Sequence, residues 1–445
     1  MNPHPRLLEL RERFRPRLTL PRAQRSAELL IEEIERAELR AWRKDAEAYR
    51  SQRFAKIAAA GSEWPRRVSK KLRHLVANGL ASARLQYAAL YDALGASGNK
   101  EAALRFARDH LLDLPMADTR LNPRAPIHEP IRLKAVLKAD GSYRPAFAYG
   151  PFMRARQELI ASILRQLLRG KFRFQALERG ASRRAVVSEI SRLALDPAYE
   201  VVATADIKNC YGTINPQYLI EFLPFPVDAI HNTILQPLNR TGDQYERVVV
   251  PEHMAAVIWP RPHARIPVSQ PRRGIPQGSS CSPMIVHAVL EAIVGSLRTT
   301  EPIIQWADNL LIFGRTSREA VDLLSQLERC LGEHSLRGIP AGPLTLGQRS
   351  ISRIRDGFSF IGVDYRIEGE RVTTSLSSES RGRFLDRLDE RIDLDEAIDD
   401  GKYTSAMNYV FHQWGPQAVT DDAPQMKSRA LARINEAAER DGYET

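Results

Sequence analysis

Hydrophobic positions recur at two different spacings along the chain, and the change of spacing divides it into parts. Helical spacing runs through residues 23–60 and again through residues 66–112, with glutamate and arginine filling the polar positions. The segment around Trp64-Pro65 interrupts this pattern. Helical spacing returns from about Ser378 to the end of the chain. We therefore predict helical regions at both flanks.

The middle of the chain alternates short β patterns with helical ones. Between residues 126 and 145, apolar and polar positions alternate around Asp140-Gly141, which predicts a β hairpin. The other expected elements are a helix over 151–170, a strand over Val201–Ile207, a helix that Ser282 caps and that begins near Pro283, β runs over Ile303–Phe313, a helix over 317–333 and a hairpin arm over Gly357–Ile367. Residues 239–273, rich in proline and arginine, are expected to form an inserted loop region. This order predicts an α+β core between helical flanks.

Charge, cysteine spacing and the lack of long apolar runs add to this picture. The excess of 65 basic over 54 acidic residues gives a net charge of +11, which favours a polyanionic partner such as nucleic acid. The three cysteines are far apart, which argues against a disulfide scaffold or a zinc knuckle and fits a reducing cytosol. We find neither a signal peptide nor an apolar run long enough for a membrane span, so we expect a cytoplasmic protein without a membrane partner. The basic stretch Lys70-Lys71-Leu72-Arg73-His74 fits a phosphate-contacting helix, and it fits a solvated helix face equally well.

Two carboxylates stand at unusual places in the β patterns. Asp206 ends an apolar β run, and Asp308 lies with Asn309 between two strongly apolar runs, where an Asp-Asn turn would make a tight hairpin. If the two strand units pair, both acids project from the edge of one small sheet, where Mg²⁺ would compensate their charge. Two such ions are the usual apparatus for in-line displacement at phosphorus. Taken singly, Asp308-Asn309 could be a plain turn and Asp206 a helix cap.

Five segments in order resemble motifs of the reverse transcriptase family. They are LKADGSYRP (Leu137–Pro145), ADIKNCYGTIN (Ala205–Asn215), RRGIPQGSSCSPMI (Arg272–Ile285), WADNLLIF (Trp306–Phe313) and FSFIGVDY (Phe358–Tyr365). In the family they are the fingers hairpin, three parts of the palm that include the aromatic-Ala-Asp-Asp motif, and the strand that grips the primer. Several ordered motifs together are far more specific than any one of them. The resemblance implies a right-hand polymerase: an N-terminal helical extension over 1–115, fingers and palm over 116–370, and a helical thumb over 371–445.

The resemblance also implies roles for particular residues. Asp206 and Asp308 would be catalytic and would ligate Mg²⁺, or Mn²⁺, together with the backbone carbonyl of Ile207. Tyr211 would exclude the 2′-hydroxyl of a ribonucleotide, since its ring is rigid and large. The remaining nucleotide contacts would come from Lys138, Arg144, Gln277 and Gly278. Read alone, Lys138 and Arg144 could be surface charges, Tyr211 could be core packing and Gln277 a loop residue.

Two positions depart from the family pattern. Asn309 stands where the family has a second aspartate; it remains in the predicted catalytic set, although an amide carries no charge. Arg349 stands near the position at which the family has a lysine. Because arginine stays protonated, it would be a poor proton donor and would act on the nucleotide electrostatically. Weakened metal use or an unusual product would follow from these departures. The alternative function is therefore a catalytically weakened, polymerase-like scaffold that binds nucleic acid.

The reverse transcriptase family contains several classes, and each class has features that can be compared with this sequence. Group II intron proteins usually add a DNA-binding or nuclease module, retron enzymes commonly lack a long N-terminal extension, and diversity-generating enzymes lose the Pro-Gln-Gly motif. By exclusion the chain is most similar to domesticated bacterial reverse transcriptases of antiphage defence, with group II intron and retron types as alternatives. We expect an RNA-directed or template-independent DNA polymerase that uses deoxynucleoside triphosphates and makes DNA. Its other expected partners are an RNA template or noncoding RNA, and a partner protein or second copy bound through residues 1–115.

Overall fold

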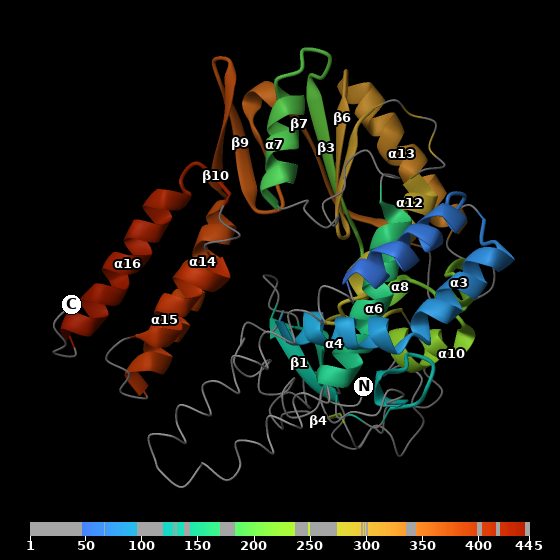
Figure 1. The fold of residues 1–445 in the computed structure, drawn as a ribbon. Helices are drawn as coiled ribbons and strands as arrows, with labels where there is room; N and C mark the ends of the chain where they lie inside the picture. Colours follow the sequence, from blue (N-terminus) through green and yellow to red (C-terminus); the bar gives the residue numbers. More distant parts are fainter. Residues whose placement is uncertain are drawn as a thin grey trace, which may run out of the picture. The chain divides into compact units, whose positions relative to one another are not determined.

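The computed structural model describes the chain in several ranges (Figure 1). They are residues 47–65, 67–95, 119–127, 129, 131–137, 143–169, 183–235, 248–249, 274–294, 297, 299, 301–334, 344–397, 403–414 and 419–440. The chain forms two compact units, each assembled from three separate segments. Unit 1 holds residues 1–169, 209–292 and 334–343, and unit 2 holds residues 170–208, 293–333 and 344–445. The interval 116–370, predicted as fingers and palm, therefore contributes to both units.

Unit 1 begins with helices that bury one face each. Residues 47–60 are helical, and they are followed by α3 (Lys70–Leu80) and α4 (Ala83–Gly95). The helical region predicted over 66–112 is divided in its described part into α3 and α4, because the chain leaves the helix at Ala81 and Ser82. Ser69 caps α3: its side chain accepts a hydrogen bond from the backbone N–H of Leu72. The break at Trp64-Pro65 is confirmed, since residues 61–65 form turns.

The predicted hairpin is present in unit 1 and leads into a long helix. Strands β1 (Ile131–Leu137) and β2 (Tyr143–Tyr149) pair antiparallel, and the expected turn at Asp140-Gly141 lies outside the described residues. Helix α6 (Pro151–Leu168) follows, as predicted. The carboxylate of Glu129 accepts hydrogen bonds from the N–H groups of Phe152 and Met153, which satisfies the first turn of α6. The short strand β4 (Val248–Val249) pairs parallel with β1, inside the segment predicted as a loop.

Short helices complete unit 1. They are the 3₁₀ turn η3 (Thr119–Leu121), α8 (Cys210–Thr213), α9 (Pro216–Phe222), α10 (Val227–Ala229), the π-helical turn η4 (Ile230–Ile234) and most of α12 (Ser282–Val294). The predicted helix at α12 is confirmed. Its first residue does not act as the expected cap, because the Ser282 hydroxyl donates to the carbonyl of Pro276 at 2.7 Å.

A four-stranded antiparallel sheet forms the centre of unit 2. Its order is β5-β6-β3-β7, with strands β5 (Ile303–Trp306), β6 (Asn309–Gly314), β3 (Val201–Ile207) and β7 (Leu346–Arg353). Unit 2 also contains helices α7 (Arg183–Ala194) and α13 (Ser317–His334). The bounds of α13 are close to the predicted range 317–333. A 3₁₀ turn, η6 (Ile354–Asp356), follows β7.

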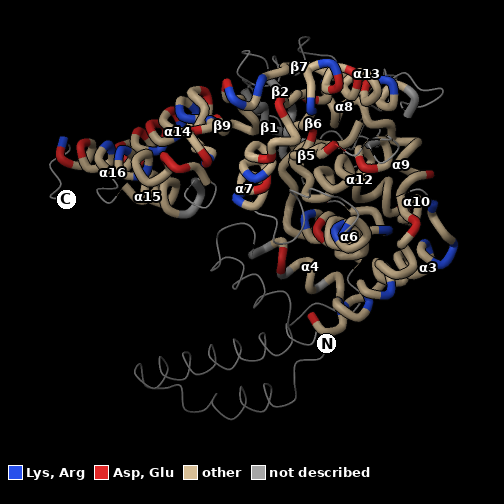
Figure 2. The backbone as a smooth tube through the Cα atoms, turned by 90° about the horizontal axis from the view of Figure 1, so that it is seen from above, with Lys and Arg blue, Asp and Glu red and all other residues tan. Residues whose placement is uncertain are grey.

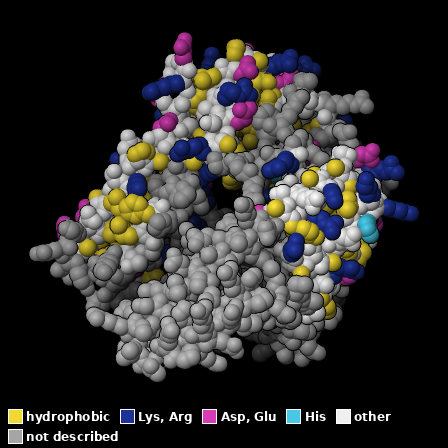
Figure 3. Space-filling model, viewed as in Figure 1, with side chains coloured by type: hydrophobic (Ala, Val, Ile, Leu, Met, Phe, Trp, Pro, Cys, Tyr) yellow, Lys and Arg dark blue, Asp and Glu magenta, His cyan; other side chains and the backbone are white. Residues whose placement is uncertain are grey.

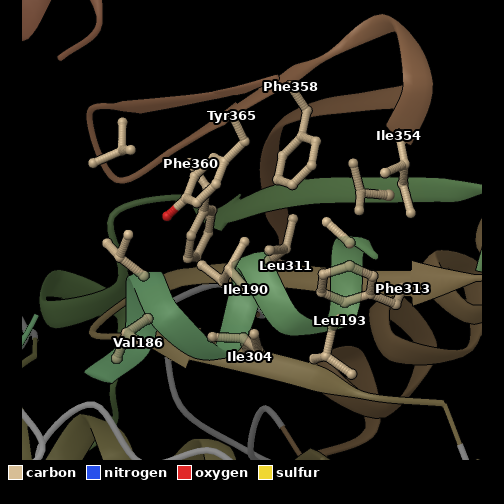
Figure 4. Packing of buried hydrophobic residues seen from close by; sticks show 14 residues of the cluster. Val186, Ile190, Leu193, Ile304, Leu311, Phe313, Ile354, Phe358, Phe360 and Tyr365 are labelled. Carbon is tan, nitrogen blue, oxygen red and sulfur yellow. The ribbon is translucent and has the colours of Figure 1, made fainter. Parts of the chain in front are cut away.

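A second sheet, β10-β9-β8, packs on the first through a shared apolar core. Its strands are β8 (Phe358–Phe360), β9 (Val363–Glu368) and β10 (Arg371–Leu376), so the predicted hairpin arm is confirmed. Figure 4 shows side chains of α7, the central sheet and the β8–β9 hairpin directed toward one another, and they belong to one buried cluster. Phe358 and Tyr365 stack with ring centroids 4.9 Å apart. The core thus fixes the central sheet from one side.

The last segment of unit 2 is helical and has its own core. It contains α14 (Ser378–Ala397), α15 (Thr404–Asn408), the π-helical turn η7 (Tyr409–Trp414) and α16 (Ala423–Arg440). A separate cluster that includes Phe384, Leu388, Val410 and Ile434 holds these helices together. The predicted helical region after Ser378 is confirmed. Within the described ranges, none of the helices combines the length and the apolar character that crossing a bilayer requires.

Candidate active site

The central sheet of unit 2 brings Asp206 and Asp308 to the same sheet end. Strand β3 pairs antiparallel with β6 so that Asp206 lies opposite Asn309. The backbone N–H of Ile207 donates to the carbonyl of Asp308 at 3.0 Å. The prediction that the two strand units pair, which rested on two apolar runs about a hundred positions apart, is therefore confirmed.

The hairpin turn that carries Asp308 differs by one residue from the prediction. Trp306 and Asn309 are the last paired residues, so the two-residue turn is Ala307-Asp308, and Asn309 is already the first residue of β6. Ala307 has φ of 53°, a left-handed conformation that is unfavourable for a residue with a Cβ. Non-glycine residues in this region are held there by the surrounding structure and cluster at functional sites.

The carboxylate of Asp206 occupies a confined place. Its Oδ1 is buried and has no hydrogen-bond partner within the described part of the chain. Gly347 stands beside it, where β7 bulges against β3: a Cβ on Gly347 would lie 2.6 Å from Oδ1 and 2.9 Å from Oδ2 of Asp206. A buried carboxylate oxygen without a partner is costly, and a cation would compensate it. The unsatisfied oxygen therefore fits a divalent metal ion, and the absence of a side chain on Gly347 makes room for the carboxylate that would bind it.

Asp308 and Asn309 supply unequal chemistry to this place. The amide Nδ2 of Asn309 lies 3.3 Å from Oδ1 of Asp308 and 3.4 Å from the carbonyl of Trp306, so it donates and adds no negative charge. Among the residues that the structure describes, no group of three or more His, Cys, Asp or Glu side chains could hold a metal. Magnesium often binds through one or two carboxylates together with water and substrate phosphates, and two carboxylates satisfy that pattern.

Arg349 lies apart from the two carboxylates. It pairs in register with Ala205, and its guanidinium forms an ion pair with Glu328 of α13. Successive side chains of a strand point to opposite faces, so Asp206 and its neighbour Ala205 face opposite ways. The hydroxyl groups of Thr204 and Ser350 meet at 2.6 Å on the face that Asp206 shares. The structure therefore places Arg349 on the other face, with an acidic partner.

Unit 1 brings together three further predicted segments. The carbonyl of Tyr211, on α8, accepts a hydrogen bond from the N–H of Ile275 at 2.7 Å. The carbonyl of Gln277 accepts one from the N–H of Phe147 on β2, also at 2.7 Å. Gly278 has φ of 97°, and a Cβ there would lie 2.2 Å from the carbonyl oxygen of Phe147. The close approach that Gly278 permits is thus to the backbone of strand β2.

The other residues predicted to contact the nucleotide lie only partly within the described ranges. Arg144 lies on β2 opposite Val136, three positions before Phe147. Lys138 lies outside the described residues. The hairpin strand that carries Arg144 is therefore fixed to the segment of Gln277 and Gly278 by backbone contacts, which is how the fold collects these distant motifs.

Two glycines matter here that sequence reasoning missed. Gly347 leaves space for the Asp206 carboxylate, and Gly274, with φ of 71°, would place a Cβ 2.0 Å from the carbonyl oxygen of Tyr211. Gly274 stands at the start of the Gly-Ile-Pro-Gln-Gly run, so its place in that motif was an available signal. Nothing in the sequence around Gly347 announces its role, because the atom it makes room for belongs to another strand.

Comparison with known families now decides the class of protein. The family model for reverse transcriptase (RNA-dependent DNA polymerase) matches residues 136–339. The chain contains a reverse transcriptase domain. That domain makes the protein a nucleotidyltransferase, an RNA-directed DNA polymerase, which acts on a nucleic-acid template and deoxynucleoside triphosphates. No curated protein matches the chain.

The reverse transcriptase domain confirms the predicted resemblance at the level of the family. The match covers Lys138, Arg144, Asp206, Tyr211, Gln277, Gly278, Asp308 and Asn309, and it ends before Gly347 and Arg349. Such a domain implies a right-hand polymerase fold, and the observed mixture of helices with small, mainly antiparallel sheets is of the predicted α+β class. Reverse transcriptases generally use divalent metals such as Mg²⁺, which agrees with the chemistry of the Asp206 site.

Proposed function

We propose that the protein adds deoxynucleotides to a primer by two-metal phosphoryl transfer, with Asp206 and Asp308 as the metal ligands. The observation that carries this proposal is the buried, unpartnered Oδ1 of Asp206 beside Gly347, at the sheet end that also holds Asp308. The backbone carbonyl of Ile207 and the side chain of Asn309 complete the proposed set. The ions, when bound, would activate the attacking hydroxyl and stabilise the charge of the leaving pyrophosphate.

The chain's own residues would bind and select the nucleotide. Tyr211 would exclude the ribose 2′-hydroxyl, and its backbone is fixed by the hydrogen bond from Ile275. Lys138 and Arg144 would neutralise the triphosphate, and Gln277 with Gly278 would position the nucleotide. Arg349 would reach a nucleotide only if its ion pair with Glu328 opened, so we give it an electrostatic contribution at most. The helices from α14 to α16 would serve as the thumb.

Primer extension tests the proposal. The full chain, with a primer annealed to an RNA template, deoxynucleotides and Mg²⁺ or Mn²⁺, should give labelled product. Asp206→Ala and Asp308→Ala should each lower the rate by about a thousandfold, which corresponds to about 4 kcal/mol in the barrier. Asp322→Ala, which removes an exposed carboxylate from α13, is the matched control and should retain the wild-type rate.

A second candidate is a polymerase-like scaffold that binds nucleic acid without turnover. Asn309 favours it, because only two carboxylates stand at the sheet end where the family has three. Absence of product with every template, primer and metal, together with tight binding of nucleic acid, would establish the scaffold. Product that persists in Asp206→Ala would refute the metal assignment.

The biological setting of this proposal is antiphage defence in the bacterial cytoplasm. It is supported by the resemblance of the palm motifs, including the intact Pro276-Gln277-Gly278. The template would be an RNA, a noncoding RNA or none, and residues 1–115 would bind a partner protein or a second copy. A plaque assay that compares cells expressing the wild type with cells expressing Asp206→Ala tests the setting: equal protection would rule out a defence role that depends on synthesis.

A further inference from the structure

Helix α3 carries a strongly basic outer face. We call the side chains of Lys70, Lys71, Arg73 and His74 the basic face; the helix contains no acidic residue. Figure 2 shows blue positions along α3 and no red ones, and Figure 3 shows lysine and arginine side chains over α3. None of the residues proposed for catalysis lies on this helix.

The exposure of the basic face follows from the helical repeat. Leu72, Val76, Gly79 and Leu80 are buried and form the inner side of α3. Residues at positions i, i+1 and i+4 from Lys70 turn away from that side, and Lys70, Lys71 and His74 are all exposed. Because the core side anchors the helix, the cations are held on a fixed surface rather than on a mobile tail.

The two lysines and the arginine of the basic face lack acidic partners among the described residues. Arg73 donates to the backbone carbonyl of Glu221 at 3.2 Å, and neither Lys70 nor Lys71 forms an ion pair there. On α14 and α16 the arrangement is different, since Arg433 pairs with Asp389 and Arg440 with Glu396. Surface arginines that pair with neighbouring acids contribute little field, whereas an uncompensated cluster attracts a polyanion.

The basic face is also fixed to α9, the helix that follows the segment of Tyr211. Arg73 and the indole Nε1 of Trp64 donate to the carbonyls of Glu221 and Phe222, at 3.2 and 3.0 Å, at the end of α9. The Trp64 ring lies 5.5 Å from that of Phe222. Helix α9 begins five positions after Tyr211 in the chain, so both belong to one compact part of unit 1.

We infer that the basic face of α3 binds the sugar-phosphate backbone of the single-stranded template, outside the nucleotide site. The identity of the strand as template rests on the proposed function; the affinity for phosphates rests on the charge. Lysine and arginine contacts to phosphate are independent of base sequence, so the face would hold and guide the strand without selecting it. An acidic protein partner is the alternative occupant that the experiment must separate.

Binding of a labelled RNA of about 20 nucleotides, measured by fluorescence anisotropy across a salt series, tests the inference. Lys70→Gln with Lys71→Gln should weaken binding on the order of tenfold. It should also reduce the slope of log K against log salt by about 1.4, for two lost phosphate contacts on a single strand. Lys70→Arg with Lys71→Arg should bind as the wild type does. Arg318→Gln with Arg329→Gln removes the same charge from the exposed side of α13 and should change neither quantity.

Nucleotide incorporation on primer-templates with short and long overhangs supplies the second measurement. With a primer-template that has a single-nucleotide overhang, the lysine variant should incorporate one nucleotide at the wild-type rate. With an overhang of about 20 nucleotides, its KM for the primer-template should rise on the order of tenfold. An unchanged salt slope, or equal losses in the α13 control, would overturn the inference while leaving the polymerase intact. Absence of all synthesis in the wild type would instead overturn the proposed function, and the binding measurement would still decide about the basic face.

Discussion

Gly347 has no side chain, and this leaves room for the carboxylate of Asp206. A Cβ on Gly347 would lie 2.6 and 2.9 Å from the two oxygens of the Asp206 carboxylate, and both distances are shorter than an ordinary van der Waals contact. Pairing with β6 and β7 holds the backbone of Asp206, so the carboxylate itself would have to move to relieve such a contact. The glycine is therefore a positioning residue for the carboxylate.

Gly347→Ala should raise the Mg²⁺ concentration needed for half-maximal primer extension about tenfold, because the displaced carboxylate holds the cation less well. A titration of activity with Mg²⁺ at saturating nucleotide measures this. Gly382→Ala is the control: a Cβ at Gly382 meets nothing within 4 Å, and the change should stabilise α14 by about 0.5–1 kcal/mol. Unchanged Mg²⁺ dependence in Gly347→Ala would show that the carboxylate has room elsewhere.

At the scale of the element, the β8–β9 hairpin joins the second sheet to the core of unit 2. Tyr365 is almost fully buried in that core, and its hydroxyl has no hydrogen-bond partner within the described residues. Burial raises the pKa of Tyr365 well above its ordinary value, so the phenol stays neutral and its unmade hydrogen bond is a cost. The ring, by contrast, stacks on Phe358 and fills the core (Figure 4).

Tyr365→Phe should accordingly leave the free energy of unfolding unchanged or raise it by up to about 1 kcal/mol. Phe358→Ala, the comparison from the opposite strand, should lower it by about 3 kcal/mol, because it removes the stacked ring and leaves a cavity. Chemical denaturation followed by fluorescence measures both. A loss of more than about 1 kcal/mol in Tyr365→Phe would reveal a hydrogen-bond partner for the hydroxyl.

The sequence was most informative about the helices and strands. Strand β3, the β8–β9 hairpin and helix α13 were predicted close to their observed ranges. Burial leaves a mark in the sequence: an amphipathic helix such as α13 shows the helical period, and β3, which is buried on both faces, shows a short run of apolar and small residues. The helical spacing over 66–112 did not show the interruption at Ala81 and Ser82. Ala81 is the C-cap of α3, and its own side chain does not mark it as a helix end.

At the scale of the whole molecule, acid should destabilise the fold through His287. The side chain is almost fully buried on α12, and burial lowers its pKa from 6.5 to about 4. Between these values the unfolded chain takes up a proton that the folded chain does not, so stability falls as the pH falls from about 6.5 to about 4 and then levels off. The stability that His287 contributes is therefore fully present above pH 6.5.

The magnitude follows from the shift: about 3 kcal/mol of stability should be lost across this range. Denaturation series at several pH values measure it. His287→Leu removes the titrating group and should lose less stability between pH 6.5 and pH 4 than the wild type does. Equal pH dependence of the two proteins would show that other groups dominate acid unfolding.

The sequence by itself indicated most of the elements and the candidate residues for the chemistry. An acid that interrupts an apolar strand is costly, so Asp206 and Asp308 stood out, and the order of five motifs pointed to a reverse transcriptase, which the domain match confirms. Only the tertiary structure decided that Asp308 ends a turn of Ala307 and Asp308, that Arg349 faces Glu328, and that Gly347 and Gly274 make room for atoms distant along the chain. Periodicity records whether a residue is buried, whereas register and close approach depend on the partner strand, whose identity no local pattern contains.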